Sequence, residues 1–132
     1  MTYVLDASAM IALLRGETGG DLVRRLVLDP ANECFAHSLS LCEVYYDFHR
    51  AAGVESADAA IDSLLAAEIY FSADMDIRFW KEAGILKADW KRISLADCFA
   101  VSLARRLEAE LVTADRHELE PLQTAVGLIF IR

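Results

Sequence analysis

The residues Thr2-Tyr3-Val4-Leu5-Asp6-Ala7-Ser8 indicate the fold of this chain. Tyr3, Val4 and Leu5 are all apolar, which predicts a short strand over residues 2–5 that is buried on both faces. A helix is expected directly afterwards, over residues 7–14, with Gly16 beyond its end. Asp6 stands at the change from strand to helix. In open α/β folds this is the edge of the sheet, at the carboxyl ends of the strands, where sites are built.

Strand and helix patterns alternate along the rest of the chain. Strands are expected at residues 33–36, 68–71, 111–113 and 128–131. One helix is expected between Thr18, which with Asp21 frames its start, and Asp29-Pro30, which stops it. Two more are expected over residues 40–52 and 74–90. The remaining two are expected directly after the capping residues Ser56 and Ser94. Strands that alternate with helices predict parallel βαβ units. Because no repeat, low-complexity tract or linker interrupts the pattern, we expect one domain over residues 1–132.

Composition and charge limit the classes of function. The chain has 132 residues, of which 55% are hydrophobic, and its net charge is −8. This charge argues against tight nonspecific binding of nucleic acid through a broad basic face, but it does not exclude a nuclease and it suits a basic protein partner. Three cysteines without CxxC spacing are typical of reduced thiols. Without a signal for secretion or a run long enough to span a bilayer, a cytoplasmic location is expected.

Four acidic residues follow the predicted strands or open the predicted helices: Asp6, Glu43, Asp97 and Asp115. In an alternating α/β chain these positions fall along one edge of the sheet. Converging carboxylates repel each other and are costly to desolvate. Divalent cations that prefer oxygen ligands would offset both penalties, so the set predicts a metal-dependent site.

Each of these acids also has a purely structural interpretation. Glu43 completes Ser40-Leu41-Cys42-Glu43, a capping box, and Asp97 does nearly the same after Ser94. Asp6 and Asp115 are suitable N-cap residues. Capping explains each acid separately but does not explain why all four fall on one edge.

In type and order these residues resemble those of the PIN-domain nucleases, and among them the VapC toxins of toxin–antitoxin pairs. The resemblance covers essentially the whole chain. It rests on residues 4–9, which include Asp6 and Ser8, on Glu43, on residues 94–100 around Asp97, and on residues 111–115. It implies a three-layer α/β/α sandwich with a five-stranded parallel sheet in the order 3-2-1-4-5. It also implies an endoribonuclease that depends on Mg²⁺ or Mn²⁺, a VapB-like antitoxin as partner, and a homodimer.

The resemblance also assigns roles to particular residues. Asp6, Glu43, Asp97 and Asp115 carry the acidic constellation as catalytic residues and metal ligands, and Thr113 carries the supporting hydroxyl, with Ser8 nearby. Glu118 is a further candidate acid, although Leu119 stands where an aromatic residue often follows. Divalent ions held by such carboxylates lower the pKa of a bound water, which can then attack the phosphorus atom of RNA.

Other side chains are weaker candidates. Arg15 and Arg116 are expected near the site and could hold RNA phosphates, whereas Lys87, Lys91 and Arg92 are more simply solvated charges around Trp90, a possible stacking ring. His37, His49 and His117 lack the spacing of metal ligands and are interpreted as surface or satisfied core residues. For the homodimer, the aromatic residues to watch are Tyr45, Tyr46, Phe48, Phe79 and Trp80.

Two other classes fit less well. A haloacid-dehalogenase-like phosphatase would need a second aspartate two residues after Asp6, where this chain has Ser8. A receiver or acidic binding module would need a phospho-acceptor aspartate in mid-chain and a later lysine at a strand end, and neither pattern is present. The target RNA is left open.

Overall fold

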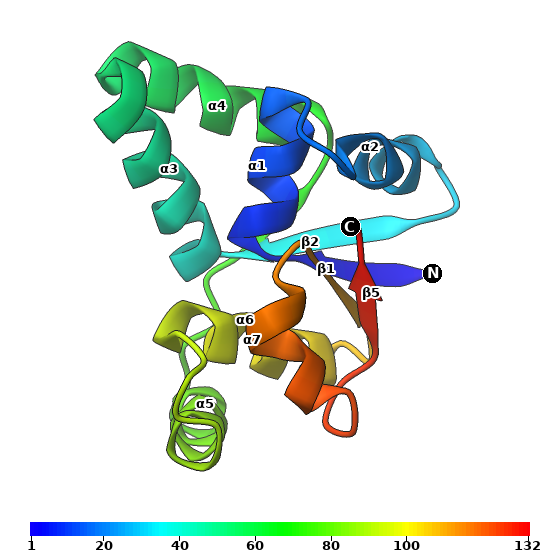
Figure 1. Ribbon diagram of the computed structural model, residues 1–132, viewed down its shortest axis with the longest axis vertical. Helices are drawn as coiled ribbons and strands as arrows, with labels where there is room; N and C mark the ends of the chain where they lie inside the picture. Colours follow the sequence, from blue (N-terminus) through cyan, green and yellow to red (C-terminus); the bar gives the residue numbers. More distant parts are fainter.

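A five-stranded parallel sheet forms the centre of the protein in the computed structural model, which describes residues 1–132 (Figure 1). The strands are β1 (Thr2–Leu5), β2 (Glu33–His37), β3 (Tyr70–Ser72), β4 (Glu110–Thr113) and β5 (Leu128–Phe130). Their order is β3-β2-β1-β4-β5, and every pairing is parallel. The predicted fold class and strand order are confirmed.

Helices cover both faces of this sheet. They are α1 (Ala7–Arg15), α2 (Gly20–Leu28), α3 (Ser38–Ala52), α4 (Val54–Ala66), α5 (Ile77–Asp89), α6 (Leu95–Arg106) and the short α7 (Arg116–Leu119), which runs into a 3₁₀ turn at Glu120–Leu122. Figure 1 shows α1 to α4 on one side of the sheet and α5 and α6 on the other. No helix is both long enough and apolar enough to cross a membrane.

Strand β1 lies in the middle of the sheet and faces two cores. Tyr3 and Leu5 belong to the core under α1 to α4, whereas Val4 belongs to the core under α5 and α6. Successive side chains of a strand point to opposite faces, so a strand covered on both sides must be apolar throughout. This is why the run Tyr3-Val4-Leu5 predicted the central strand.

The start of α3 differs from the sequence prediction. The helix begins at Ser38 and not at Ser40, because Nδ1 of His37 accepts the N–H of Leu39 as the cap, 3.1 Å away. Ser40 is buried inside the helix. The predicted capping box from Ser40 to Glu43 is therefore wrong, and capping does not account for Glu43.

Other helix and strand boundaries also differ from those predicted from the sequence. α4 begins at Val54 without a side-chain cap, not at Ser56. α5 begins at Ile77, where Asp76 accepts the N–H of Phe79 at 2.9 Å, rather than at residue 74. Glu68 has a φ of +62°, so it forms the turn before β3 and not the start of the strand. Helix α7 and its 3₁₀ turn were not predicted, because segments this short carry no periodic signal.

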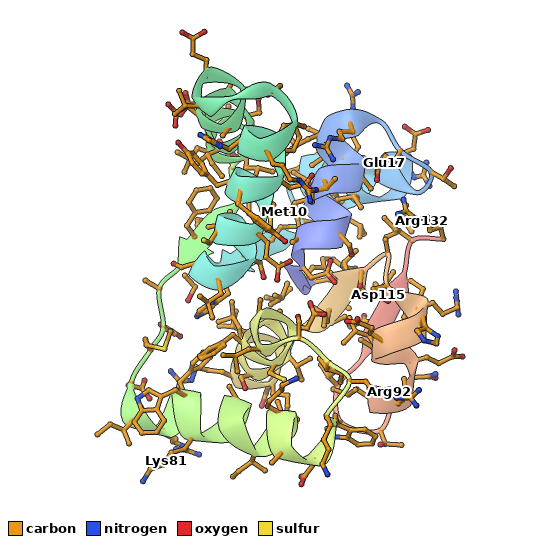
Figure 2. The ribbon with its side chains drawn as sticks, turned by 60° about the vertical axis from the view of Figure 1, so that its left-hand side comes forward. Met10, Glu17, Lys81, Arg92, Asp115 and Arg132 are labelled. Carbon is orange, nitrogen blue, oxygen red and sulfur yellow. The ribbon has the colours of Figure 1, made fainter.

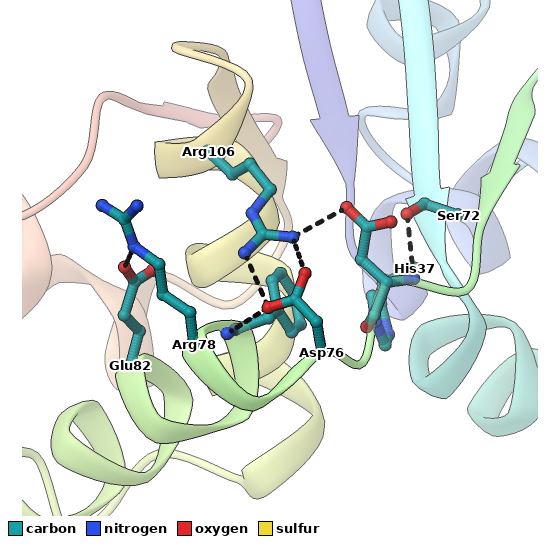
Figure 3. Close-up of polar contacts among 8 residues, drawn as sticks. His37, Ser72, Asp76, Arg78, Glu82 and Arg106 are labelled. Carbon is teal, nitrogen blue, oxygen red and sulfur yellow. Dashed lines mark hydrogen bonds and ion pairs between the residues drawn. The ribbon is translucent and has the colours of Figure 1, made fainter.

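Polar contacts fasten the connection between β3 and α5 (Figure 3). Arg106 on α6 pairs with Asp76 at 2.8 Å and with Asp74 at 3.4 Å, and its guanidinium lies 4.9 Å from the ring centre of Phe79. His37 is fully buried and bonds through Nε2 to the carbonyl of Asp74, 2.8 Å away. For His37 the interpretation as a satisfied core histidine is confirmed.

Candidate metal centre

Asp6 is the acid at the centre of the site. It directly follows β1, is 1% exposed, and caps α1: its Oδ1 accepts the N–H of Ala9 at 2.9 Å and the hydroxyl of Ser8 at 2.6 Å. Both of these contacts are made by Oδ1, and the Thr113 hydroxyl lies close enough to lower the pKa of the same carboxyl. The cap orients the carboxylate through one oxygen, so capping and ligation are compatible.

The hydroxyls of Ser8 and Thr113 join the ends of β1 and β4. Their oxygens lie 3.3 Å apart, within hydrogen-bonding distance, and the Ser8 hydroxyl donates to Asp6. Ser8 also accepts the N–H of Ala114, and Thr113 accepts the N–H of Asp115, both at 2.9 Å. The segment that carries Asp115 is therefore held against Asp6 by residues from both strand ends.

Asp115 caps α7 with Oδ1, which accepts the N–H of Glu118 at 3.0 Å. On the opposite side, Asp97 lies in the first turn of α6 and donates its N–H to the capping Ser94 at 3.1 Å. Carboxylate oxygens of Asp97, Asp115 and Glu118 all lie within 4.8 Å of one another. Two separate parts of the chain, the start of α6 and the start of α7, thus meet in a group that could hold a metal ion.

Glu43 projects from the second turn of α3, the helix that packs against α6. Its carboxylate is half-buried and has no hydrogen-bond partner in the protein. Burial raises its pKa, and the charges of Asp6 and Glu118 raise it further. The structure thus brings all four predicted acids together with Glu118, although Asp6 and Glu43 lie outside the tightest group of three.

Burial and mutual repulsion make the site unfavourable for negative charge. Burial raises the pKa of Asp97 to about 8, and the charges of Asp6 and Glu43 add to this effect. The pKa of Asp6 is also raised, mainly by burial, although the nearby hydroxyls and the N–H of Ala9 oppose the shift. None of the protein's ion pairs involves the five acids. A set of oxygen donors without an internal cation fits Mg²⁺ or Mn²⁺.

The two arginines predicted near the site have other contacts. Arg15 ends α1, and a helix of this length places it about 13 Å from the Asp6 end. It pairs with Asp47 on α3 at 2.6 Å and stacks on Phe48. Arg116 directly follows Asp115, and its guanidinium lies 4.3 Å from the ring centre of Phe130. The structure therefore places Arg116, but not Arg15, beside the acids.

Sequence reasoning gave Glu118 less weight than its position requires. The signal was present in Asp115-Arg116-His117-Glu118, since an aspartate followed three residues later by glutamate is typical of a helix start. A short helix there turns Glu118 back toward Asp97.

Comparison with known proteins identifies the family of this chain. A model of the PIN domain family matches residues 3–120, and the chain therefore belongs to the PIN-domain family. No curated protein matches the chain significantly in sequence.

Several solved structures share the fold. VapBC2 from Rickettsia felis, bound to a DNA fragment from its promoter, matches with a TM-score of 0.77 at 19% identity over 98% of both chains. DNA-bound VapBC from Salmonella typhimurium matches with a TM-score of 0.76 at 15% identity over 100% of this chain and 99% of that one. VapC20 from Mycobacterium tuberculosis, a sarcin-ricin loop cleaving toxin, matches with a TM-score of 0.66 at 18% identity over 90% and 94% of the two chains. In fold, the chain is similar to the VapC toxins.

Proposed function

We propose that this protein is an endoribonuclease that depends on Mg²⁺ or Mn²⁺ and acts in the cytoplasm as the toxin of a VapBC-type pair. The observation that carries the proposal is the convergence of five carboxylates on one edge of the sheet without an internal cation. Membership of the PIN-domain family and the likeness in fold to VapBC toxins support it.

The residues divide the work of the site. Asp6, Glu43, Asp97, Asp115 and Glu118 would hold the ion, while Ser8 and Thr113 keep Asp6 and Asp115 in place. A bound Mg²⁺ or Mn²⁺ would activate water and neutralise charge on the phosphoryl group. No histidine is needed as a base, and His37 is already occupied by Asp74 and Leu39.

A cleavage assay tests this function. The protein should cut a labelled single-stranded RNA with Mg²⁺ or Mn²⁺ and stop when EDTA is added. Asp6→Asn should lower the rate by more than about 100-fold, because even the outer partners of metal ligands are commonly worth 10- to 100-fold. Asp62→Asn is the matched control, since Asp62 is exposed and makes no polar contact. Cleavage that survives EDTA, or an Asp6→Asn variant with full activity, would rule out the metal mechanism.

The antitoxin is proposed to lie in an apolar groove and to reach the acids with a cation. A cavity of about 320 Å³ between α1, α2 and α4 offers Leu13, Leu14, Val27 and Leu28 to an apolar segment. An arginine from the partner would pair with the acid cluster, because its guanidinium binds a carboxylate through two hydrogen bonds. If the purified complex cleaves RNA as fast as the free protein, or if Arg→Ala in the partner leaves inhibition intact, this mode of inhibition is wrong.

A homodimer is proposed through the exposed face of α5. Ile77, Trp80 and Ile85 on this helix are 44–62% exposed. Phe79, which the sequence suggested for this surface, is fully buried against α6 and His37, so that prediction is wrong. Light scattering at tens of micromolar should give twice the chain mass, and Trp80→Glu should give a monomer. A monomeric wild-type protein would contradict the proposal.

A further inference from the structure

A second cavity, of about 380 Å³, lies beside the acid cluster. Its walls are the connection from α5 to α6 and the start of α7 with the turn that follows (Figure 2). The residues that matter for its chemistry are Asp89, Trp90, Lys91, Arg92, His117 and Glu118. Because Glu118 also belongs to the acid cluster, the cavity adjoins the candidate metal centre.

The walls of this cavity are held in place by the fold. The ammonium of Lys87 donates to the carbonyls of Lys91 at 3.0 Å and Ile93 at 2.6 Å. Ile93 is 2% exposed and donates its N–H to the carbonyl of Trp90 at 3.0 Å. On the other side, the buried Leu119 fixes the short helix capped by Asp115. A ligand would therefore enter a site that is already formed.

Two cations beside this cavity are free. Lys91 and Arg92 are exposed and their side chains make no ion pair or hydrogen bond, whereas five arginines elsewhere in the protein are paired with acids. Beside them Trp90 is half-buried and lines the cavity. Their place next to an acidic site distinguishes Lys91 and Arg92 from the unpaired Arg25 and Arg105 elsewhere in the protein. A flat ring together with an anion is the kind of ligand that suits these neighbours.

We propose that this cavity is a nucleotide subsite that takes one unpaired nucleotide of the RNA beside the cut bond, with its base on Trp90 and its phosphate at Lys91 and Arg92. This inference rests on the proposed function and adds where the substrate is held. The volume falls within the range of roughly 300–1,000 Å³ that small-ligand sites have. Only single-stranded RNA fits, because the bases of a duplex are stacked on each other and cannot reach a side chain.

Tryptophan fluorescence measures this binding directly. The chain has two tryptophans, so Trp80→Phe leaves Trp90 as the only reporter. A hexamer of single-stranded RNA, titrated in EDTA at low salt so that it is not cut, should quench Trp90 to saturation. A duplex of the same sequence should quench it at least fivefold less at equal concentration. Equal quenching by the duplex, displacement of the RNA by hexaglutamate at equal concentration, or no quenching at all overturns the subsite.

The roles of Lys91 and Arg92 are tested by comparing their double variant with a control double variant that removes the same charge elsewhere. Lys91→Ala with Arg92→Ala should raise the Kd for the hexamer and lower the slope of log Kd against log salt by about 0.7, the contribution of the one phosphate that the two cations share. Arg25→Ala with Arg105→Ala removes the same charge from exposed, unpaired positions elsewhere and should change neither quantity. If both pairs have the same effect, the cavity is not the binding site.

Substitutions of Trp90 test stacking separately from folding. Trp90→Phe keeps an aromatic ring, whereas Trp90→Leu keeps bulk against the core but removes the ring. Stacking of one base is worth about 1–3 kcal/mol, so only Trp90→Leu should raise KM for RNA cleavage, by about 5- to 100-fold. Circular dichroism confirms that both variants fold. Equal KM for the two variants and the wild type overturns the role of Trp90.

These outcomes separate the subsite from the proposed function. If RNA binds to Trp90 in EDTA but no metal supports cleavage, the nuclease assignment fails and the subsite stands. If RNA is cleaved with Mg²⁺ or Mn²⁺ while the variants of Trp90, Lys91 and Arg92 keep the wild-type KM and Kd, the subsite fails and the nuclease assignment stands.

Discussion

Replacing Asp97 with asparagine should stabilise the protein when no metal is present. The pKa of this carboxyl is about 8 in the folded protein, against an ordinary value of 3.8. An acid whose pKa is raised by folding destabilises the folded state once the unfolded chain can release the proton. The free energy of unfolding of the wild type, relative to that of Asp97→Asn, is therefore highest below pH 4. It falls as the pH rises from 4 to 8 and is constant above pH 8.

The size of the effect follows from the same values. Each tenfold difference in proton affinity is worth about 1.4 kcal/mol, so the raised pKa of Asp97 costs at most about 4 kcal/mol of stability at pH 7, where the folded protein keeps the proton that the unfolded chain releases. Because Asp97 is only half-buried and water screens part of its charge, we expect Asp97→Asn to gain about 2 kcal/mol. For a chain of this length that is a rise in Tm of about 6 °C.

Thermal unfolding in EDTA at pH 4, 6 and 8 measures this difference, with Asp62→Asn as the control that should unfold like the wild type. Adding Mn²⁺ at ten times its Kd should raise the stability of the wild type by about 1.4 kcal/mol and that of Asp97→Asn by much less. The reasoning is refuted if Asp97→Asn is no more stable than the wild type at pH 8 without metal. It is also refuted if the difference does not shrink toward pH 4.

Three further outcomes are expected. Binding of Mn²⁺ at pH 7 should release about one proton per ion, because Asp97 is mostly protonated at that pH. Calorimetry in two buffers of different ionisation enthalpy will show whether the heat of Mn²⁺ binding changes as one released proton requires. Glu118→Gln should weaken Mn²⁺ binding by about tenfold while Glu120→Gln, a neighbouring exposed acid, should leave it unchanged; equal effects in a metal titration would remove Glu118 from the site. Gly20→Ala should destabilise the protein by about 2 kcal/mol or more, because the added methyl would clash with the carbonyl of Ala12 on the neighbouring helix. Gly84→Ala meets no atom within 4 Å and should stabilise α5 by about 0.5–1 kcal/mol, and urea unfolding of the pair will show whether the signs are opposite.

Local patterns were sufficient for the strands and their parallel pairing, whereas the strand order came from the family resemblance. Continuous apolar runs predicted strands covered on both faces, and the alternation with helices predicted parallel pairing, which together define the sheet. The positions of Asp6 and Asp115 at strand ends followed from the same patterns, because the carboxyl ends of parallel strands meet at one edge. These features depend on neighbours in sequence, so the sequence is enough to read them.

Helix starts depended on contacts that no local pattern encodes. His37 caps α3 two residues earlier than Ser40 would, because its imidazole is already held by Asp74 and by the rings of Phe79 and Phe99. Asp76 opens α5 where Arg106 pairs with it. The partners of His37 and of Asp76 come from distant parts of the chain. Tertiary packing therefore decides which residue caps each helix.

The sequence by itself determined the strands of the sheet and the acids that follow β1 and β4. The order of the strands followed from the family resemblance of the sequence. The tertiary structure alone decided that Glu118 joins Asp97 and Asp115, that Phe79 is buried, and that Trp90 lines a cavity beside the acids. The physical reason is the range of the forces involved. Strand and helix patterns record burial one residue at a time, whereas the distance between two carboxylates, or between a ring and a cation, is set by how whole elements pack.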